Sequence, residues 1–305
     1  MVQLGVLLPP TSFHRAVGVV IVSVAAYGWL SVVSAHADTG AGADFLDGST
    51  HALILGPTFI PDPAAFPGYV PAVVADYLQP LGFSTSGTVT ALVTPESPFF
   101  GPSIASGVDT LVNTIEADYN ANEISAADPL TVFGYSQSAV IESLAEQQLA
   151  AYKIPLEDVR FVMIGDAAAD PPSGPTGILD TLGATPFGQD LDHLLGWSNL
   201  IDVTTPNNLY PTDVFTVVDD FFADTVLRAE FSANPLEAIR EDFRGVFEHG
   251  AYLGFLPESE IVTAIDTAGV VDGATTYFTL ADPVSVFEAL RDVVALLPDL
   301  GITIP

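Results

Sequence analysis

The chain has 305 residues, of which 49% are hydrophobic and 15% charged, so it is long enough to bury a large core and too apolar to be intrinsically disordered. Its 38 acidic residues stand against 7 Lys and Arg, a formal net charge of −31, which excludes the basic surface that nucleic acids and anionic lipids require. The absence of cysteine excludes disulfides, thiolate metal sites and a cysteine nucleophile.

The N-terminal segment 1–37 contains no acidic residue and has the pattern of a targeting sequence. His14 and Arg15 precede an apolar stretch, 16–33, which is followed by a run of small residues that ends at Ala37. We expect this segment to be a signal peptide or, because the apolar stretch is just long enough to cross a bilayer, an uncleaved membrane anchor. Both alternatives predict a secreted or cell-envelope protein.

After a flexible leader at 38–49, short apolar runs alternate with stretches of helical periodicity. Strands are predicted at 51–55, 88–94, 130–133, 159–164 and 213–218, and helices at 69–78, 104–119, 138–152 and 235–247. Buried strands that alternate with helices are typical of a mostly parallel sheet with helices on both faces. We expect one α/β domain over 50–290 and a tail at 291–305.

The connection 167–211 between the fourth and fifth predicted strands is long and carries many large apolar side chains. We expect it to form a helical cap over a pocket for a lipophilic acyl chain. The alternative is a helical excursion that packs on the core without covering a ligand. His193 lies in this connection, either within the cap or on the surface.

The third predicted strand ends in the sequence Gly134-Tyr-Ser136-Gln-Ser138, and a helix begins at once. A sharp strand–turn–helix with small residues two before and two after a serine is typical of a nucleophile elbow, which predicts Ser136 as the nucleophile. The helix N-terminus and the amide of Gln137 would favour negative charge on an oxyanion. The alternative is an ordinary serine that caps the helix.

The loop after the first predicted strand is the usual source of a second oxyanion donor. Pro57 has no N–H group to donate, so Thr58 is the predicted donor. Gly56 and Pro57 would equally suit a plain turn.

A serine nucleophile needs a histidine base, and in the α/β-hydrolase fold the chain order is serine, acid, histidine. This order excludes His51 and favours His249, which follows a predicted helix and precedes a flexible Gly250. The histidines show no spacing typical of metal ligands, so neither a metal nor another cofactor is expected.

The acid should follow a strand between the serine and the histidine. Asp220, just after the fifth predicted strand, is best placed, with Asp219 and Asp224 as neighbours. Asp166, after the preceding strand, is a second candidate. We favour Asp220 as the acid and keep Asp166 and Asp224 as alternatives.

Together these residues resemble the PE-PPE domain family of secreted or cell-envelope serine hydrolases with an α/β-hydrolase fold. The resemblance runs from about 51 to 282 and rests on the strand and loop at 53–63, Thr94-Pro-Glu96, the elbow at 134–138, 161–165, Tyr210-Pro-Thr212 with Asp220 and Ala223-Asp224, and His249-Gly-Ala-Tyr252. The elbow also resembles that of cutinases. The resemblance implies Ser136, Asp220 and His249 as the catalytic triad.

The chain departs from the family pattern at two positions near the predicted site. Pro57 replaces a second glycine in the loop after the first strand, and Asp219 replaces an aromatic residue before the predicted acid. The second departure doubles the negative charge beside Asp220.

The predicted activity is hydrolysis of carboxylic esters of lipophilic acyl groups through an acyl-enzyme, as an esterase or lipase. The first alternative is an acyltransferase that moves the acyl group to a sugar hydroxyl in glycolipid assembly. The second is a catalytically inactive envelope binding protein. The expected partner is an acyl-ester or glycolipid substrate, with membrane or cell-envelope association and no obligate protein partner.

Overall fold

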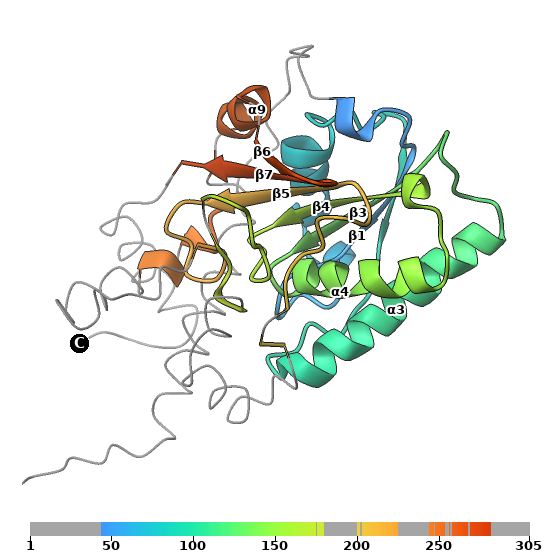
Figure 1. Cartoon of the computed structure of the whole chain (residues 1–305), viewed down its shortest axis with the longest axis horizontal. Coiled ribbons are helices and arrows are strands. Elements are labelled where there is room, and N and C mark those ends of the chain that lie inside the picture. The colour runs from blue at the N-terminus through green and yellow to red at the C-terminus, as the bar shows by residue number, and fades with distance from the viewer. Residues whose placement is uncertain are drawn as a thin grey trace, which may run out of the picture.

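Figure 1 shows the protein as a computed structural model, which describes residues 44–174, 176–179, 200–201, 203–224, 244–246, 248–253, 256, 258–267 and 269–281. The predicted targeting segment 1–37, most of the leader and the tail 291–305 lie outside the described residues. So do residues 180–199 of the predicted cap, including His193, and most of the predicted helix at 235–247. The limits of the domain and the presence of the cap therefore stay predictions.

The centre of the molecule is a seven-stranded sheet with the strand order β2-β1-β3-β4-β5-β7-β6. The strands are β1 His51–Ile54, β2 Thr88–Ala91, β3 Leu130–Tyr135, β4 Val159–Ile164, β5 Thr212–Val217, β6 Val270–Asp272 and β7 Thr275–Leu280. Neighbouring strands pair in parallel, except that β6 runs antiparallel to β7. Every residue of β3 and β5 is buried, as expected for strands covered on both faces.

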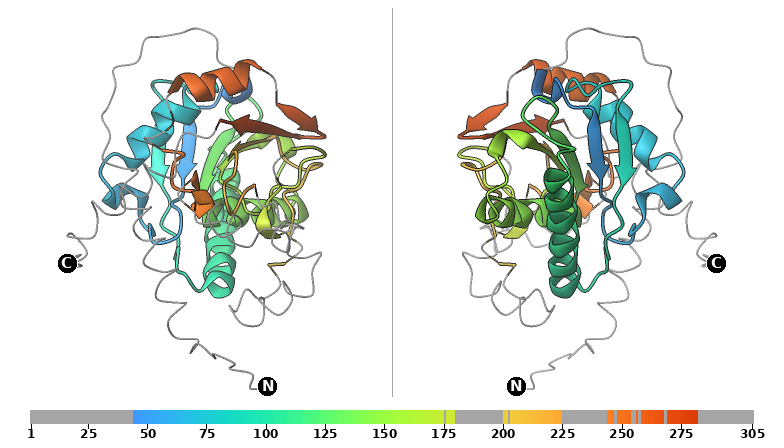
Figure 2. Two further views of the ribbon diagram at one scale, coloured as in Figure 1. Left: turned by 90° about the vertical axis from the view of Figure 1, so that its left-hand side faces the viewer. Right: turned by 90° about the vertical axis from the view of Figure 1, so that its right-hand side faces the viewer.

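Helices cover both faces of the sheet (Figures 1 and 2). One face carries α3 (Phe100–Asn120) and α4 (Gln137–Ala151), and the other carries α2 (Tyr69–Val73), η3 (Val74–Leu78) and α9 (Glu258–Asp266). Single helical turns occur at η1 (Asp44–Leu46), η2 (Pro63–Ala65) and η4 (Leu156–Asp158). Each face has its own apolar core, so the predicted α/β-hydrolase fold with helices on both faces is confirmed.

The predicted strands are all present, and the deviations from prediction lie mainly at element ends. The strand expected through residue 94 ends at Ala91, and the helix expected from Ile104 begins at Phe100, since Pro102 lies in its first turn where a missing N–H is tolerated. The helix expected over 69–78 is α-helical only to Val73 and continues as the wider turn η3. The sequence did not predict α9, β6 or β7.

The strand order brings the carboxyl ends of β3, β4 and β5 side by side at one edge of the sheet. In open parallel sheets this edge is where ligands bind. None of the described helices has the length and apolar character required to span a bilayer.

Candidate active site

Ser136 occupies the tight turn between β3 and α4, with φ 60° and ψ −115°. Positive φ is rare outside glycine, so the surrounding structure must hold this conformation. A Cβ atom on Gly134 would lie 2.6 Å from a carboxylate oxygen of Glu142 and 2.8 Å from the backbone of Ser138, so only glycine fits there. The Ser138 hydroxyl accepts from the Tyr135 N–H at 2.8 Å, which closes the turn.

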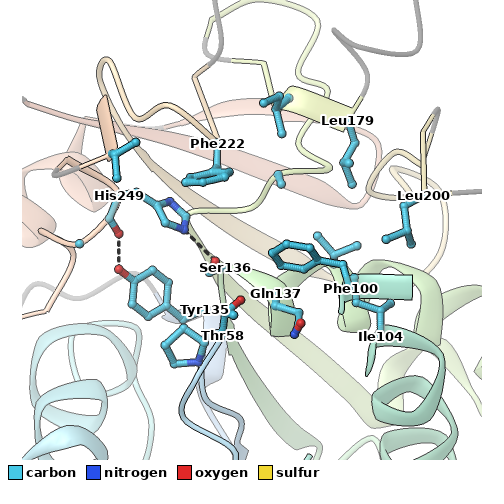
Figure 3. Close-up of a pocket in the computed structure, with 16 residues that line it drawn as sticks. Thr58, Phe100, Ile104, Tyr135, Ser136, Gln137, Leu179, Leu200, Phe222 and His249 are labelled. Carbon is cyan, nitrogen blue, oxygen red and sulfur yellow. Dashed lines mark hydrogen bonds between the residues drawn. The ribbon is translucent and has the colours of Figure 1, made fainter. Parts of the chain in front are cut away.

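Ser136 and Asp220 each lie within hydrogen-bond distance of the His249 ring, and Figure 3 shows the contact with Ser136. The Ser136 Oγ atom is 2.7 Å from Nε2 of His249, and Nδ1 of the same ring is 2.9 Å from both carboxylate oxygens of Asp220. A ring protonated at Nδ1 donates to Asp220 and leaves Nε2 free to accept the serine proton. This is the arrangement required of a nucleophile, a general base and an orienting acid.

Asp220 is fully buried and held by donors other than the histidine. Its carboxylate accepts from the N–H groups of Phe222 at 2.8 Å and Ala223 at 3.2 Å. The Tyr252 hydroxyl donates to Oδ2 at 2.6 Å and itself accepts from the Val217 N–H at 2.9 Å. These bonds fix the carboxylate at the end of β5.

The structure places the two alternative acids away from the histidine ring. Asp166 is buried, accepts from the Ala168 N–H at 2.9 Å and accepts from the Thr205 hydroxyl. Burial raises the pKa of Asp166 to about 6. Asp224 accepts from the Asp219 N–H at 2.8 Å. Of the three candidate acids, the structure brings only Asp220 to His249.

Neighbouring groups fix the position of the His249 ring, and sequence reasoning missed them. The Tyr135 hydroxyl donates to the backbone carbonyl of His249, and the Phe222 ring centroid is 4.5 Å from the imidazole centroid. A Cβ atom on Gly165, whose φ is 58°, would lie 3.0 Å from Cε1 of His249. A glycine directly after a predicted strand is the one sequence signal that could have drawn attention to this position.

Arg244 lies between the two acidic residues that precede Asp220 and His249. Its Nε atom donates to Glu248 at 3.2 Å, and its NH1 atom is 3.6 Å from a carboxylate oxygen of Asp219. Glu248 is fully buried, which raises its pKa to about 8, while Arg244 acts in the opposite direction. The extra negative charge that Asp219 adds beside the site therefore has a cationic partner.

Thr58 and Gln137 both line the pocket beside Ser136 (Figure 3). Within the described part of the chain, neither backbone N–H donates a hydrogen bond, as expected of amides reserved for an oxyanion. The Gln137 side chain instead donates to Glu96 at 3.0 Å. Sequence analysis noted Glu96 only as part of the family resemblance and did not assign it to the site.

The pocket above Ser136 is lined mainly by apolar side chains. Phe100, Ile104, Leu179 and Leu200 lie together on the side away from His249, and Phe222 lies above the imidazole (Figure 3). The complete lining is Pro57, Thr58, Phe100, Ile104, Tyr135, Ser136, Gln137, Val140, Ala167, Ile178, Leu179, Leu200, Phe222, Val246, His249 and Gly250. Among the described residues, no group of three or more His, Asp or Glu could hold a metal ion.

Comparison with known proteins identifies a family. The model of the PE-PPE domain matches residues 79–296. The chain is 29% identical over 267 residues to an uncharacterized PPE family protein, PPE28, of Mycobacterium tuberculosis, covering 80% of this chain and 36% of that protein. It is 27% identical over 297 residues to esterase PE16 of the same organism, covering 88% of this chain and 51% of that protein. The chain thus spans between about a third and a half of the length of these relatives.

Two solved structures are similar at low identity. Lysin B from mycobacteriophage D29 has a TM-score of 0.41 and 12% identity, covering 84% of this chain and 92% of that chain. A cutinase-like protein from Cryptococcus sp. has a TM-score of 0.36 and 17% identity, covering 68% of this chain and 97% of that chain.

Proposed function

Since the chain belongs to the PE-PPE domain family, we propose that it is a serine esterase that hydrolyses carboxylic esters of lipophilic acyl groups. The observation that carries the proposal is the contact chain from Ser136 through His249 to Asp220, at 2.7 and 2.9 Å, on the floor of an apolar pocket. The similarity to a protein named esterase PE16 supports the same reaction.

In the first half of the reaction, the Ser136 oxygen bonds to the ester carbonyl carbon while Nε2 of His249 takes the hydroxyl proton. The carbonyl electron pair moves to oxygen, where the amides of Thr58 and Gln137 stabilise the negative charge. Asp220 stabilises the imidazolium. The tetrahedral intermediate then collapses, the alcohol leaves with the proton from Nε2, and the acyl group stays on Ser136.

In the second half, water enters the pocket and His249 takes its proton as the oxygen attacks the acyl carbon. Collapse of the second intermediate releases the carboxylic acid and returns the proton to Ser136. Apart from this water, every group that acts in these steps comes from the chain itself.

The pocket lining supports a lipophilic acyl group as the part of the substrate that binds. Phe100, Ile104, Leu179 and Leu200 offer apolar surface on one side of the nucleophile, and burial of each methylene group contributes about 0.8 kcal/mol. We therefore expect esters with a hydrocarbon acyl chain to bind more tightly than acetate esters.

The test uses p-nitrophenyl esters of acetate, butyrate and octanoate together with a fluorophosphonate probe. The wild type should hydrolyse butyrate and octanoate with a lower KM than acetate and should be labelled at a single serine. The Ser136→Ala variant should lose labelling and at least about a thousandfold in kcat/KM. Folded wild type that neither hydrolyses the esters nor takes the label would contradict the proposal and favour an inactive binding protein.

Transfer to a sugar hydroxyl is the less favoured reaction. A sugar acceptor needs several hydrogen-bonding side chains to hold it, and two polar side chains of the described pocket, Tyr135 and Gln137, already donate to His249 and Glu96. Adding trehalose to the octanoate assay separates the two reactions, because a transferase would form acylated sugar in excess of free octanoate.

Export to the cell envelope or beyond is part of the proposal. It is supported by the charge and apolar pattern of residues 1–37. Expression of the full chain in a mycobacterial host, followed by cell fractionation, tests it. N-terminal sequencing of the recovered protein then separates cleavage after Ala37 from retention as an anchor, and recovery of the intact chain from the cytosol would contradict export.

A further inference from the structure

The two amides that we assign to the oxyanion hole come from segments far apart in the sequence, so their spacing must be fixed by other contacts. Thr58 lies in the loop after β1, and Gln137 is the first residue of α4. Both N–H groups must reach within about 2.7–3.1 Å of one oxygen to stabilise its charge. A third segment, residues 94–97 after β2, contacts the neighbour of the first residue, Phe59, and the side chain of the second.

Glu96 makes the contacts that join these segments. Its Oε2 atom accepts from the Gln137 side-chain amide at 3.0 Å. Its backbone carbonyl accepts from the N–H of Phe59, the neighbour of Thr58, at 2.7 Å. Its Oε1 atom accepts from the Thr94 hydroxyl at 2.7 Å. One residue therefore connects the start of α4 to the loop that carries the other donor.

The same region is anchored to α3 and held in uncommon backbone conformations. The side-chain amide of Gln137 also lies 3.3 Å from the Ser97 carbonyl and 3.3 Å from the Ser103 hydroxyl. The Ser103 hydroxyl in turn accepts from the Ser97 N–H at 2.8 Å. Glu96 has φ 41° and Phe59 has φ 74°, values that side-chain-bearing residues rarely adopt. Such conformations persist only where neighbouring contacts hold them, and they cluster at functional sites.

The environment of the Glu96 carboxyl disfavours a negative charge beside the oxyanion. It is 1% exposed, and no cation of the described residues contacts it. Burial raises its pKa to about 8, although its hydrogen bonds with Thr94 and Gln137 act in the opposite direction. Burial thus favours the neutral form of the carboxyl, which adds no charge beside the oxyanion.

We propose that Glu96 is a positioning residue that sets the spacing of the Thr58 and Gln137 amides. The inference rests on the proposed esterase function, because only that function gives the amides a task. Another buried carboxyl on α4 contacts a different part of the fold: Glu146 accepts from the Thr212 hydroxyl on β5 at 3.2 Å, and no described contact joins it to the loop that carries Thr58.

The first experiment compares Glu96→Ala with Glu96→Gln in hydrolysis of p-nitrophenyl butyrate. Glu96→Ala should lower kcat about 10- to 100-fold with KM within twofold, because the amides act on the transition state more than on the bound ester. Glu96→Gln keeps an oxygen that accepts from the Gln137 side chain, and its NH2 group can donate to the Thr94 hydroxyl, which then accepts instead of donating. This variant should stay within about threefold of the wild-type kcat. Unchanged kcat in Glu96→Ala, or an equal loss in both variants, would overturn the proposal.

The second experiment changes Gln137, the partner of Glu96 in this contact. Gln137→Ala keeps the backbone amide and removes only the side chain that Glu96 holds, so its kcat should fall about as far as that of Glu96→Ala. The double variant should lose little more than either single variant, because both changes break one contact. Additive losses in the double variant would overturn the proposal. So would a Gln137→Ala kcat equal to that of the wild type, and this second test remains valid if Glu96→Ala does not fold.

Glu146→Ala serves as the matched control, since it removes an equally buried carboxyl that has no contact with the oxyanion loop. It should lower the melting temperature while kcat stays within twofold. An equal fall in kcat in this variant would show a general effect of core disruption and overturn the proposal. Wild type that fails to take a fluorophosphonate label would instead reject the esterase function itself, which separates the two failures.

Discussion

Asp220 and His249 are oriented by tyrosine hydroxyl groups whose aromatic rings are buried beside them. Tyr252 donates to Asp220, and Tyr135 donates to the backbone carbonyl of His249. The Tyr135 and Tyr252 ring centroids lie 5.6 Å apart, so the two rings also pack against each other. Both hydroxyl groups therefore help to hold residues of the proposed triad.

Tyr252→Phe removes the hydroxyl and leaves the ring in place. Because a donor to the Asp220 carboxylate is lost, we expect kcat toward p-nitrophenyl butyrate to fall about 5- to 20-fold with little change in KM, and stability to fall by about 1–2 kcal/mol. Steady-state kinetics and urea denaturation measure the two effects. Tyr210→Phe, which loses a buried hydroxyl donating to Ile154 at 2.9 Å, is the control and should lose stability only. Equal kcat in all three proteins would contradict the expectation.

The sequence predicted the site residues whose positions are constrained by chain order and by the ends of strands. Ser136 and His249 follow from the strand–turn–helix pattern and the small number of histidines. The acid was less certain, because Asp219, Asp220 and Asp224 lie within a few residues and sequence alone does not give their directions. Contacts between distant segments, such as that of Glu96 with Gln137, leave no periodic signal and could not be predicted.

At the scale of secondary structure elements, one arginine connects the two segments that carry Asp220 and His249. Arg244 contacts Asp219 on the segment after β5 and Glu248 on the helical turn before His249. The Phe221 N–H donates to the Gly245 carbonyl at 3.0 Å between the same two segments. The pair with Asp219, which is 47% exposed, contributes little stability, whereas the pair with buried Glu248 matters more.

Arg244→Met should lower both kcat and stability, and the loss of stability should grow as pH rises. The pKa of Glu248 is already raised to about 8, and removing the cation raises it further. At pH 5 the Glu248 carboxyl is protonated in the folded state of both proteins, so the variant loses little, whereas near pH 9 the variant must bury an unpaired carboxylate or bind a proton that the solvent no longer supplies readily. Melting temperatures of the wild type and the variant at pH 5 and pH 9 measure the difference.

The double variant Arg244→Met with Glu248→Gln is the matched control. A neutral amide in place of the carboxyl removes the charge that Arg244 compensates, so this protein should regain most of the stability lost at pH 9. A loss of equal size at both pH values, or no recovery in the double variant, would contradict the role of Arg244 as the partner of Glu248.

Predictions at this scale succeeded for β1 to β5 and missed the two C-terminal strands, β6 and β7. Strands β3, β4 and β5 are recognisable because nearly all of their residues are buried. In contrast, β6 has only three residues, two of them exposed, and depends on pairing with β7 rather than on an apolar pattern of its own. A short edge strand of this kind is set by tertiary contacts, which explains why β6 was missed.

At the scale of the whole molecule, the excess of acidic residues extends into the interior. Burial raises the pKa of Asp213, Glu96 and Glu248 to about 8, and that of Asp166 to about 6. Each of these carboxyls binds its proton more tightly in the folded protein than in the unfolded chain. Their contribution to stability is therefore fully present below the unfolded pKa values, near pH 4, and is lost as pH rises through the folded values.

We therefore expect the protein to be more stable at pH 5 than at pH 8, with the melting temperature falling steadily between them. Self-repulsion from a net charge of −31 at pH 7 acts in the same direction, because lower pH reduces it. Calorimetry at unit steps from pH 5 to pH 9 measures the trend, in buffers matched for ionic strength. A melting temperature that is flat or rises across this range would contradict the expectation.

Asp213→Asn separates the buried carboxyls from the surface charge. Asp213 lies on β5 and is 3% exposed, and its raised pKa arises first from burial, against which its hydrogen bond with Thr276 acts. An asparagine there changes the net charge by one but removes a group that releases its proton near pH 8. The variant should lose less stability than the wild type between pH 5 and pH 9, by a few kcal/mol at most. Asp109→Asn is the control, because it makes the same change of charge at an exposed carboxyl on α3 and should leave the dependence of stability on pH unchanged. An equal dependence on pH in all three proteins would assign the effect to surface repulsion.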